Sequence, residues 1–486
     1  MQLQKKLLTG MFWVLLLNLL IKPFWILGIE VGVQNAVGEV EYGLYYGIFS
    51  LAYIFNILLD LGVTNFNTRN IARHPHLISK HLGGVLCIKL LLLALYVVVT
   101  LTAGLLLGYD SRQFYLLAFL CLNQFLNSLI LYLRSNFEGL LLFRWDSVIS
   151  ILDRVVMILI CGALLWLPGH PGFRIEYFVY AQTAAYLLTA LVSLAVLLAR
   201  MPRGGGRVRL RFSKPFALAI LKQSLPFALL ALLMASYNRI DPVLLQRLIP
   251  DGTFQSGIYA KAFRLLDALT MIAYLVSVPL LPIFARLTQT AGTDRAELTS
   301  TTRLVTSLML VFSVTAALLL ASLDEPLMAL LYDRHTHESA AVFRILIFGI
   351  IPISMTYVYG TLLTAAGRLR WLNILAATTL VINVAVNLCL IPRMGAAGSA
   401  WASLSAQSFM AVTQMVVALK IFHLRPRTGY IIKIMLFTLL ITVLCRLALL
   451  WWVKLLLVGA AALLLAVALK LIDVKEIATI LKHKGQ

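Results

Sequence analysis

The chain has 486 residues, of which 61% are hydrophobic and only 13% are charged, and its formal net charge is +21 at pH 7. A soluble globular protein is about half apolar and about a quarter charged, so this composition excludes a water-soluble enzyme. The basic residues are scattered through short loops rather than gathered in one domain, which indicates a membrane protein and argues against nucleic-acid binding.

Long apolar segments recur along the whole chain and predict an all-α, polytopic membrane protein. In lipid, the backbone polar groups of each segment must be satisfied within it, so an apolar run of about 20 residues is expected to be a helix. The first run follows Lys5 and Lys6 but continues past Trp25 without a small-residue cleavage site, so it is interpreted as a span rather than a signal peptide. About 14 spans are expected, near 7–32, 42–62, 83–108, 113–134, 147–167, 176–200, 217–248, 256–285, 300–322, 340–365, 372–392, 395–422, 428–449 and 451–471.

The loops alternate between strongly and weakly basic along the chain. With the N-terminus inside, the cytoplasmic loops hold most of the basic residues, and the opposite loops carry acidic residues such as Glu39, Glu41 and Asp251. Because short cytoplasmic loops are enriched in lysine and arginine, this asymmetry predicts that both termini lie in the cytoplasm.

The longest basic connection, with three consecutive glycines at 204–206, is interpreted as a flexible linker between two helix bundles. Six spans precede it, so both halves are expected to begin on the same side of the membrane, as parallel repeats do. A weak sequence match supports such a repeat, because Tyr42-Gly43-Leu44-Tyr45 and Ser256-Gly257-Ile258-Tyr259 each open the second helix of their half. The predicted domains are a six-helix bundle over 1–200, a cytoplasmic linker over 201–216, a second six-helix bundle over 217–422, and an extra helix pair with a tail over 423–486.

We expect no cofactor and no metal. The linker glycines lack the Gly-Lys-Ser/Thr ending of a phosphate loop. The five cysteines all lie inside apolar runs without paired spacing, so they are interpreted as core residues. His335, His337 and Glu338 share an outer loop and are interpreted as solvated rather than as metal ligands.

Charged residues inside the predicted spans are the candidate functional residues. Each costs about 3 kcal/mol or more at the bilayer centre and is therefore expected to face other helices or water. Arginine and lysine both bind phosphate well, and the spacing of residues 261, 264 and 267 places them on one face of a helix. We predict that four bases line a cationic cavity between the two halves and bind an anionic group such as a diphosphate: Lys22, Arg239, Lys261 and Arg264.

The competing interpretation is structural neutralisation. Arg264 then pairs with Asp267, and Arg239 and Asp241 each pair with a neighbouring helix. The two aspartates are candidate ion-coupling residues, although structural pairing is the favoured role. Five bases near span ends are expected to extend toward the membrane surface: Lys89, Lys222, Arg344, Arg446 and Lys454.

Several stretches together resemble the Wzx-type polysaccharide flippases of the multidrug/oligosaccharidyl-lipid/polysaccharide exporter superfamily. The matching pieces are spread over most of the chain, and the most specific is the stretch from Asn387 to Ala400, similar to the family's turn between two late helices. The others are Glu41-Tyr42-Gly43-Leu44-Tyr45, Leu59-Asp60-Leu61-Gly62, Arg69 with Arg73, Tyr237-Asn238-Arg239-Ile240-Asp241, Gly257-Ile258-Tyr259-Ala260, Arg264-Leu265-Leu266-Asp267, Leu281-Pro282-Ile283-Phe284-Ala285-Arg286 and Ala365-Ala366-Gly367-Arg368.

The resemblance implies a flippase, not an enzyme. Such a protein moves a polyprenyl-diphosphate-linked oligosaccharide from the cytoplasmic to the outer leaflet of a bacterial inner membrane, by alternating access, for O-antigen, capsule or exopolysaccharide synthesis. Its expected partners are the lipid-linked substrate, membrane lipids and the polysaccharide polymerase machinery. The sugar carried and the coupling ion stay open, and the lipid II flippase branch would give the same cavity.

Two other functions remain as alternatives. A drug or metabolite antiporter of the same superfamily would favour buried carboxylates, whereas bases outnumber acids among the candidate cavity residues. A polytopic transferase or polymerase acting on lipid-linked sugars would be expected to carry a large outer loop with catalytic residues. Glu39 and Glu41 are a thin candidate for the acidic pair of such an enzyme, and the longest outer loop, near 323–339, is short.

Overall fold

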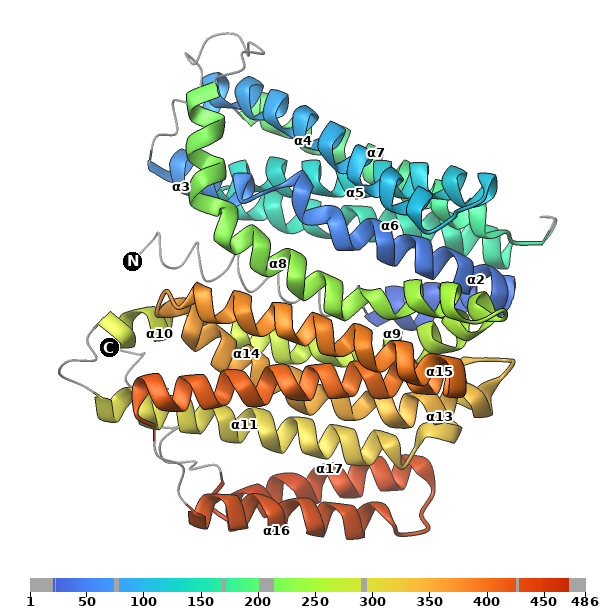
Figure 1. Ribbon diagram of the computed structural model, residues 1–486, viewed down its shortest axis with the longest axis vertical. Coiled ribbons are helices and arrows are strands. Elements are labelled where there is room, and N and C mark those ends of the chain that lie inside the picture. Colours follow the sequence, from blue (N-terminus) through green and yellow to red (C-terminus); the bar gives the residue numbers. More distant parts are fainter. Residues whose placement is uncertain are drawn as a thin grey trace. The chain divides into compact units, whose positions relative to one another are not determined.

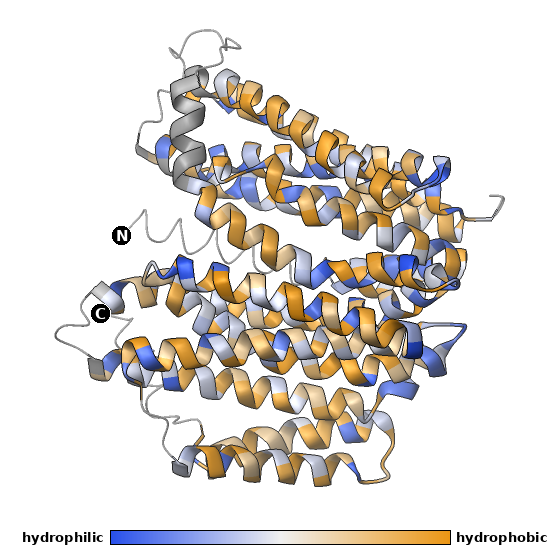
Figure 2. Ribbon diagram, viewed as in Figure 1, coloured by the Kyte–Doolittle hydropathy of each residue, from blue (hydrophilic) through white to orange (hydrophobic). Residues whose placement is uncertain are grey.

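The computed structural model describes residues 21, 23–73, 78–167, 172–200, 214–289, 295–424 and 428–471, and these residues form helices joined by short turns, with no strand among them (Figure 1). Eleven of the described helices are long and apolar enough to cross a membrane. Hydrophilic residues gather near the helix ends, and apolar residues cover most of the helix surfaces between them (Figure 2). The chain is therefore a multi-pass, all-α membrane protein, as predicted.

The longest helical segment, α15 (Leu369–Phe422), is two antiparallel spans. Its backbone leaves the helical region at Gly395, with φ 54° and ψ −129°. Ser399 Oγ donates to Asn387 Oδ1 at 3.0 Å, and Thr379 Oγ1 lies 3.4 Å from the sulfur of Met410. In one straight helix the second pair would be about 45 Å apart. The segment thus folds back at Gly395, which confirms the predicted spans 372–392 and 395–422.

A second turn lies at Gly38, inside the span-length segment that runs from Trp25 to Leu59. Gly38 has φ 79° within helix α2 (Val31–Ile54). The ring of Phe178 lies 6.0 Å from Trp25 and 5.3 Å from Tyr45, measured between centroids. Twenty residues of straight helix would separate those two by about 30 Å, so the chain turns between them. Residues 1–20 and Lys22, at the start of the first predicted span, lie outside the described residues.

The predicted span 256–285 is divided into α9 (Gly252–Ser277) and α10 (Leu280–Gln289), with a bend of 40° between them. Pro279 and Pro282 lie at this bend. Proline lacks the N–H of a helical hydrogen bond and its ring clashes with the preceding turn, which explains the break. This bent pair and the two folded-back segments account for the predicted spans from 42–62 onward, whereas most of the first predicted span, 7–32, lies outside the described residues.

The first compact unit covers Met1–Gly257. Helix α5 contacts α2, α3, α6 and α7, and α8 packs along α2 (Figure 1). An apolar core that includes Tyr132 and Phe137 lies around α3, α4 and α5. Its helices are η1 (Trp25–Glu30), α2, η2 (Phe55–Leu59), α3 (Val63–Arg73), α4 (Ile78–Leu106), α5 (Ser111–Gly139), α6 (Phe143–Trp166), α7 (Ile175–Arg200) and α8 (Lys214–Leu248), and α9 begins in this unit.

The second compact unit covers Ile258–Gln486. Helix α14 contacts α10, α11 and α15, and the pair α16–α17 packs on α11 through an apolar cluster that includes Phe437, Ile441 and Val458. Beyond α9, α10 and α15, its helices are α11 (Arg295–Ala321), α12 (Asp324–Leu331), α13 (Thr336–Leu346), η4 (Ile347–Gly349), α14 (Ile350–Ala365), α16 (Thr428–Cys445) and α17 (Trp451–Ala468).

Candidate functional site

Arg239, one of the predicted substrate-binding bases, lies in α8 and is held by two aromatic residues of α2. Its Nη1 donates a hydrogen bond to the hydroxyl oxygen of Tyr46 at 3.0 Å. Its guanidinium carbon lies 5.3 Å from the centroid of the Tyr53 ring, which is a cation–π contact. Tyr46 is fully buried, whereas Arg239 and Tyr53 are half-buried. The packing of α8 on α2 therefore fixes a planar cation beside a half-buried aromatic ring.

A row of aromatic side chains runs along α2 toward this arginine. The rings of Tyr42 and Tyr46 stack at 6.3 Å, those of Tyr45 and Phe49 at 5.8 Å, and the rings of Phe49 and Tyr53 lie 5.9 Å apart. Residues four apart on a helix are neighbours, so this spacing builds a continuous aromatic surface. The sequence alone shows the spacing, but not that Arg239, 193 residues away from Tyr46, completes it.

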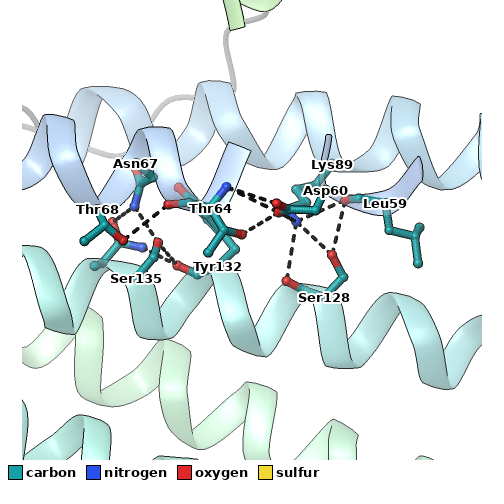
Figure 3. Close-up of polar contacts among 10 residues, drawn as sticks. Leu59, Asp60, Thr64, Asn67, Thr68, Lys89, Ser128, Tyr132 and Ser135 are labelled. Carbon is teal, nitrogen blue, oxygen red and sulfur yellow. Dashed lines mark hydrogen bonds and ion pairs between the residues drawn. The ribbon is translucent and has the colours of Figure 1, made fainter. Parts of the chain in front are cut away.

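The second span breaks at Asp60, where this aspartate meets a buried lysine (Figure 3). Lys89 Nζ lies 2.7 Å from Asp60 Oδ1, and it also donates to Leu59 O at 3.0 Å and to Ser128 Oγ at 2.8 Å. The Lys89 side chain is 1% exposed and that of Asp60 is 26% exposed. The expectation that Lys89 extends to the membrane surface is therefore wrong, since its ammonium instead satisfies the last carbonyl before the break.

The same aspartate begins the next helix. Asp60 Oδ1 accepts a hydrogen bond from Thr64 N at 3.3 Å. Between the two helices Leu61 and Gly62 have positive φ values, 40° and 81°. The chain can thus leave η2 and enter α3 because Lys89 satisfies one end of the break and Asp60 the other. Helix α3 itself was expected to be part of a loop.

Helix α3 is fixed to α5 by a short polar seam (Figure 3). Asn67 Nδ2 donates to Ser135 Oγ at 2.8 Å and to Asn136 Oδ1 at 3.0 Å. All three residues are buried. Buried polar groups that satisfy one another specify a single packing arrangement, so the seam sets the position of α3 against α5.

A second charged cluster lies inside the first unit. Arg154 donates to the adjacent carboxylate of Asp153, and it also interacts electrostatically with Tyr186 and Glu30. Glu30 and Asp153 are both buried. The four residues come from η1, α6 and α7, so they connect the end of the first span to two other helices.

In the second unit, three predicted site residues share one face of α9, as their spacing predicts. Lys261 is 2% exposed; its Nζ donates to Arg334 O at 2.9 Å and lies 4.9 Å from the Tyr332 ring centroid. Arg264 and Asp267 follow at one-turn intervals and are half-buried. Lys261 thus holds the segment after α12 against α9, while the next two charged residues are more accessible.

Three further residues that the sequence analysis named are Asp241, Lys22 and Glu41. Asp241 lies two residues after Arg239 in α8 and is fully buried. Lys22 lies outside the described residues. At the predicted outer end, Arg112 binds Glu41 at 2.6 Å and Glu176 at 2.7 Å, so Glu41 belongs to a three-residue ion cluster.

The comparisons with known proteins agree with this architecture. The chain matches the family model described as polysaccharide biosynthesis protein over residues 7–288, more than half of its length. Its fold is similar to that of the lipid II flippase MurJ in an inward closed conformation, with a TM-score of 0.70 and 13% identity over 93% of this chain and 98% of that chain.

Two MATE transporters have a similar fold. An inward-facing multidrug resistance MATE family transporter of the MOP superfamily gives a TM-score of 0.65 at 14% identity, over 82% of this chain and 94% of that chain. The Vibrio cholerae MATE transporter VcmN in its bent form gives 0.55 at 14% identity, over 87% and 97%. No curated protein sequence matches the chain. Identities this low show a shared fold and leave the substrate to be argued from the site.

Proposed function

The chain belongs to the polysaccharide biosynthesis protein family, and from this premise we propose that it is a flippase for polyprenyl-diphosphate-linked oligosaccharides. It moves these lipids from the cytoplasmic to the outer leaflet of a bacterial inner membrane by alternating access, for the synthesis of O-antigen, capsule or exopolysaccharide. Both termini lie in the cytoplasm under this proposal, and the polysaccharide polymerase machinery receives the product.

The observation that carries the proposal is the placement of Arg239. A diphosphate must lose water when it enters a membrane protein, and this loss is compensated only by fixed positive charge and hydrogen-bond donors. Arg239 is such a charge, held against Tyr46 and Tyr53 rather than extended to the surface. A guanidinium binds phosphate oxygens in a two-pronged manner that suits a diphosphate.

We assign the other predicted bases to the same task. Further positive charge along the path of the headgroup comes from Lys22, Lys261 and Arg264. The structure describes the last two, and half-buried Arg264 is more accessible than Lys261. The half-buried rings of Phe49 and Tyr53 offer flat apolar faces beside Arg239, against which sugar rings can pack. The polyprenyl tail stays in lipid while the headgroup crosses.

Asp241 and Asp267 are the proposed ion-coupling residues. Full burial of Asp241 in α8, two residues from Arg239, supports this role, because binding of a cation or proton there changes the charge next to the substrate arginine. The competing role, a structural ion pair within the protein, predicts a loss of folding rather than a loss of ion coupling when the carboxylate is replaced.

The test is leaflet transfer in proteoliposomes with an imposed ion gradient. The substrate is a labelled polyprenyl-diphosphate oligosaccharide, and a membrane-impermeant reagent modifies only the sugar that is exposed outside. We expect transfer that depends on the protein, together with no export of a lipophilic cationic dye. Export of the dye without lipid transfer would contradict the proposal and favour the drug antiporter.

A further inference from the structure

The two glycines that mark the sequence repeat lie against each other in the first compact unit. A Cβ atom added to Gly43 would overlap Thr253 O and lie 2.6 Å from Gly257 N. One added to Gly257 would overlap Glu39 O and lie 2.8 Å from Glu39 Cα. Each glycine therefore meets the backbone four residues before the other glycine. This reciprocal contact brings the backbones of α2 and the first turns of α9 closer together than any other residue type allows.

Two side chains hold this contact from the α8–α9 side. Gln246 Nε2 donates to Gly43 O at 2.5 Å and to Leu44 O at 3.3 Å, and Ser256 Oγ donates to Gly43 O at 3.3 Å. Ser256 is fully buried. The contact therefore combines backbone packing with neutral hydrogen bonds from Gln246 and Ser256.

Ordered side chains surround the contact at the predicted outer end. Arg247 stacks on Tyr109 at 4.7 Å and donates to Gln113 Oε1 at 3.1 Å. Burial raises the pKa of the Tyr109 hydroxyl far above its ordinary value, although Arg247 opposes this shift, so the ring stays neutral under the guanidinium. These contacts fix the end of α8 to the α4–α5 corner, next to the glycine contact.

The repeat extends beyond the glycines. Tyr45 stacks on Phe49 in α2, and Tyr259 stacks on Phe263 in α9 at 5.5 Å. These residues stand two and six positions after their glycines in both helices. The glycine contact thus joins corresponding positions of the two repeats, and a contact of this kind is where two repeats can close on each other symmetrically.

We propose that the Gly43–Gly257 contact, together with Gln246 and Ser256, is the outer gate of the transporter. It is closed in this structure and separates when the outer side opens to release substrate. This inference rests on the proposed function, because only an alternating-access transporter needs a gate. The backbone-to-backbone contact suits a gate because it closes tightly and only the hydrogen bonds from Gln246 and Ser256 have to break when it opens.

The test measures how often the gate is open. In a variant that lacks the native cysteines, Ser256→Cys places a thiol beneath the closed gate, where a membrane-impermeant thiol reagent added from the outer side reaches it only after opening. Adding Gly43→Ala is expected to increase the labelling rate by at least about fivefold and to reduce lipid transfer by a similar factor. Gly172→Ala is the matched control, because nothing lies within 4 Å of its added Cβ, and it should change neither readout.

A second variant distinguishes opening of the gate from misfolding caused by the added methyl group of Gly43→Ala. Gln246→Ala removes the two hydrogen bonds to Gly43 O and Leu44 O without adding an atom, so it cannot fail through a clash, and it should also increase labelling. Wild-type labelling in folded Gly43→Ala and Gln246→Ala proteins would overturn the gate, as would reduced transfer with unchanged labelling. Labelling that rises as expected, in a protein that transfers no lipid-linked oligosaccharide, would support the gate and contradict the proposed function instead.

Discussion

Lys89 is the residue whose placement differs most from its sequence-based interpretation. It lies seven residues into a strongly apolar span that begins at Leu82, and a lysine near a span end usually extends toward the surface. Its burial depends on Leu61 and Gly62, whose positive φ values end the helix beside it and expose the carbonyl of Leu59. The sequence of α4 alone cannot predict the burial of Lys89, because the break that causes it occurs almost thirty residues earlier in the chain.

The Lys89 contacts give a stability prediction. Replacing Lys89 with Met leaves a carboxylate and a carbonyl without their cation, which we expect to cost about 3 kcal/mol of stability. The double replacement Lys89→Met with Asp60→Asn should cost less, because it leaves no unpaired charge. Thermal unfolding in detergent measures both, and Lys420→Met, at an exposed lysine of α15, is the control. Equal melting temperatures for Lys89→Met and Lys420→Met would contradict the assigned role.

At the scale of elements, helix boundaries followed from hydropathy wherever a helix is limited by polar loops or by a glycine turn. The turn at Gly395 lies where the predicted spans 372–392 and 395–422 separate. The short helices α3 and α12 were not predicted. The start of α3 depends on the cap that Asp60 forms, and Lys89 of a neighbouring helix holds this aspartate in place.

The folded-back form of α15 gives a prediction at this scale. A Cβ at Gly398 would lie 2.5 Å from Leu390 O and 2.7 Å from the Leu390 carbonyl carbon, and both are backbone atoms that cannot move aside. We expect Gly398→Ala to destabilise the second unit by about 2 kcal/mol. Gly459→Ala in α17, where nothing lies within 4 Å, should stabilise by up to about 1 kcal/mol. Their melting temperatures in detergent should therefore shift in opposite directions, and a shift in the same direction would contradict this view of the turn.

At the scale of the whole molecule, composition and span count were sufficient to predict an all-α, multi-pass membrane protein. The order of the short motifs was sufficient to indicate the family that the residue 7–288 match then established. Only part of the candidate site could be predicted from the sequence. Residues 261, 264 and 267 share a face because helical periodicity requires it, whereas the partners of Arg239 come from α2 and depend on tertiary packing.

The most direct test of the account is the rate of leaflet transfer by Arg239→Ala, compared with wild type in the same proteoliposomes. Arg370→Ala is the matched control, because it removes an exposed arginine, and Arg239→Lys retains the charge but loses the planar fork. We expect transfer of the diphosphate-linked oligosaccharide to fall by at least about tenfold in Arg239→Ala, to fall less in Arg239→Lys, and to be unchanged in Arg370→Ala. A wild-type rate in folded Arg239→Ala would contradict the assignment of this arginine to the substrate diphosphate.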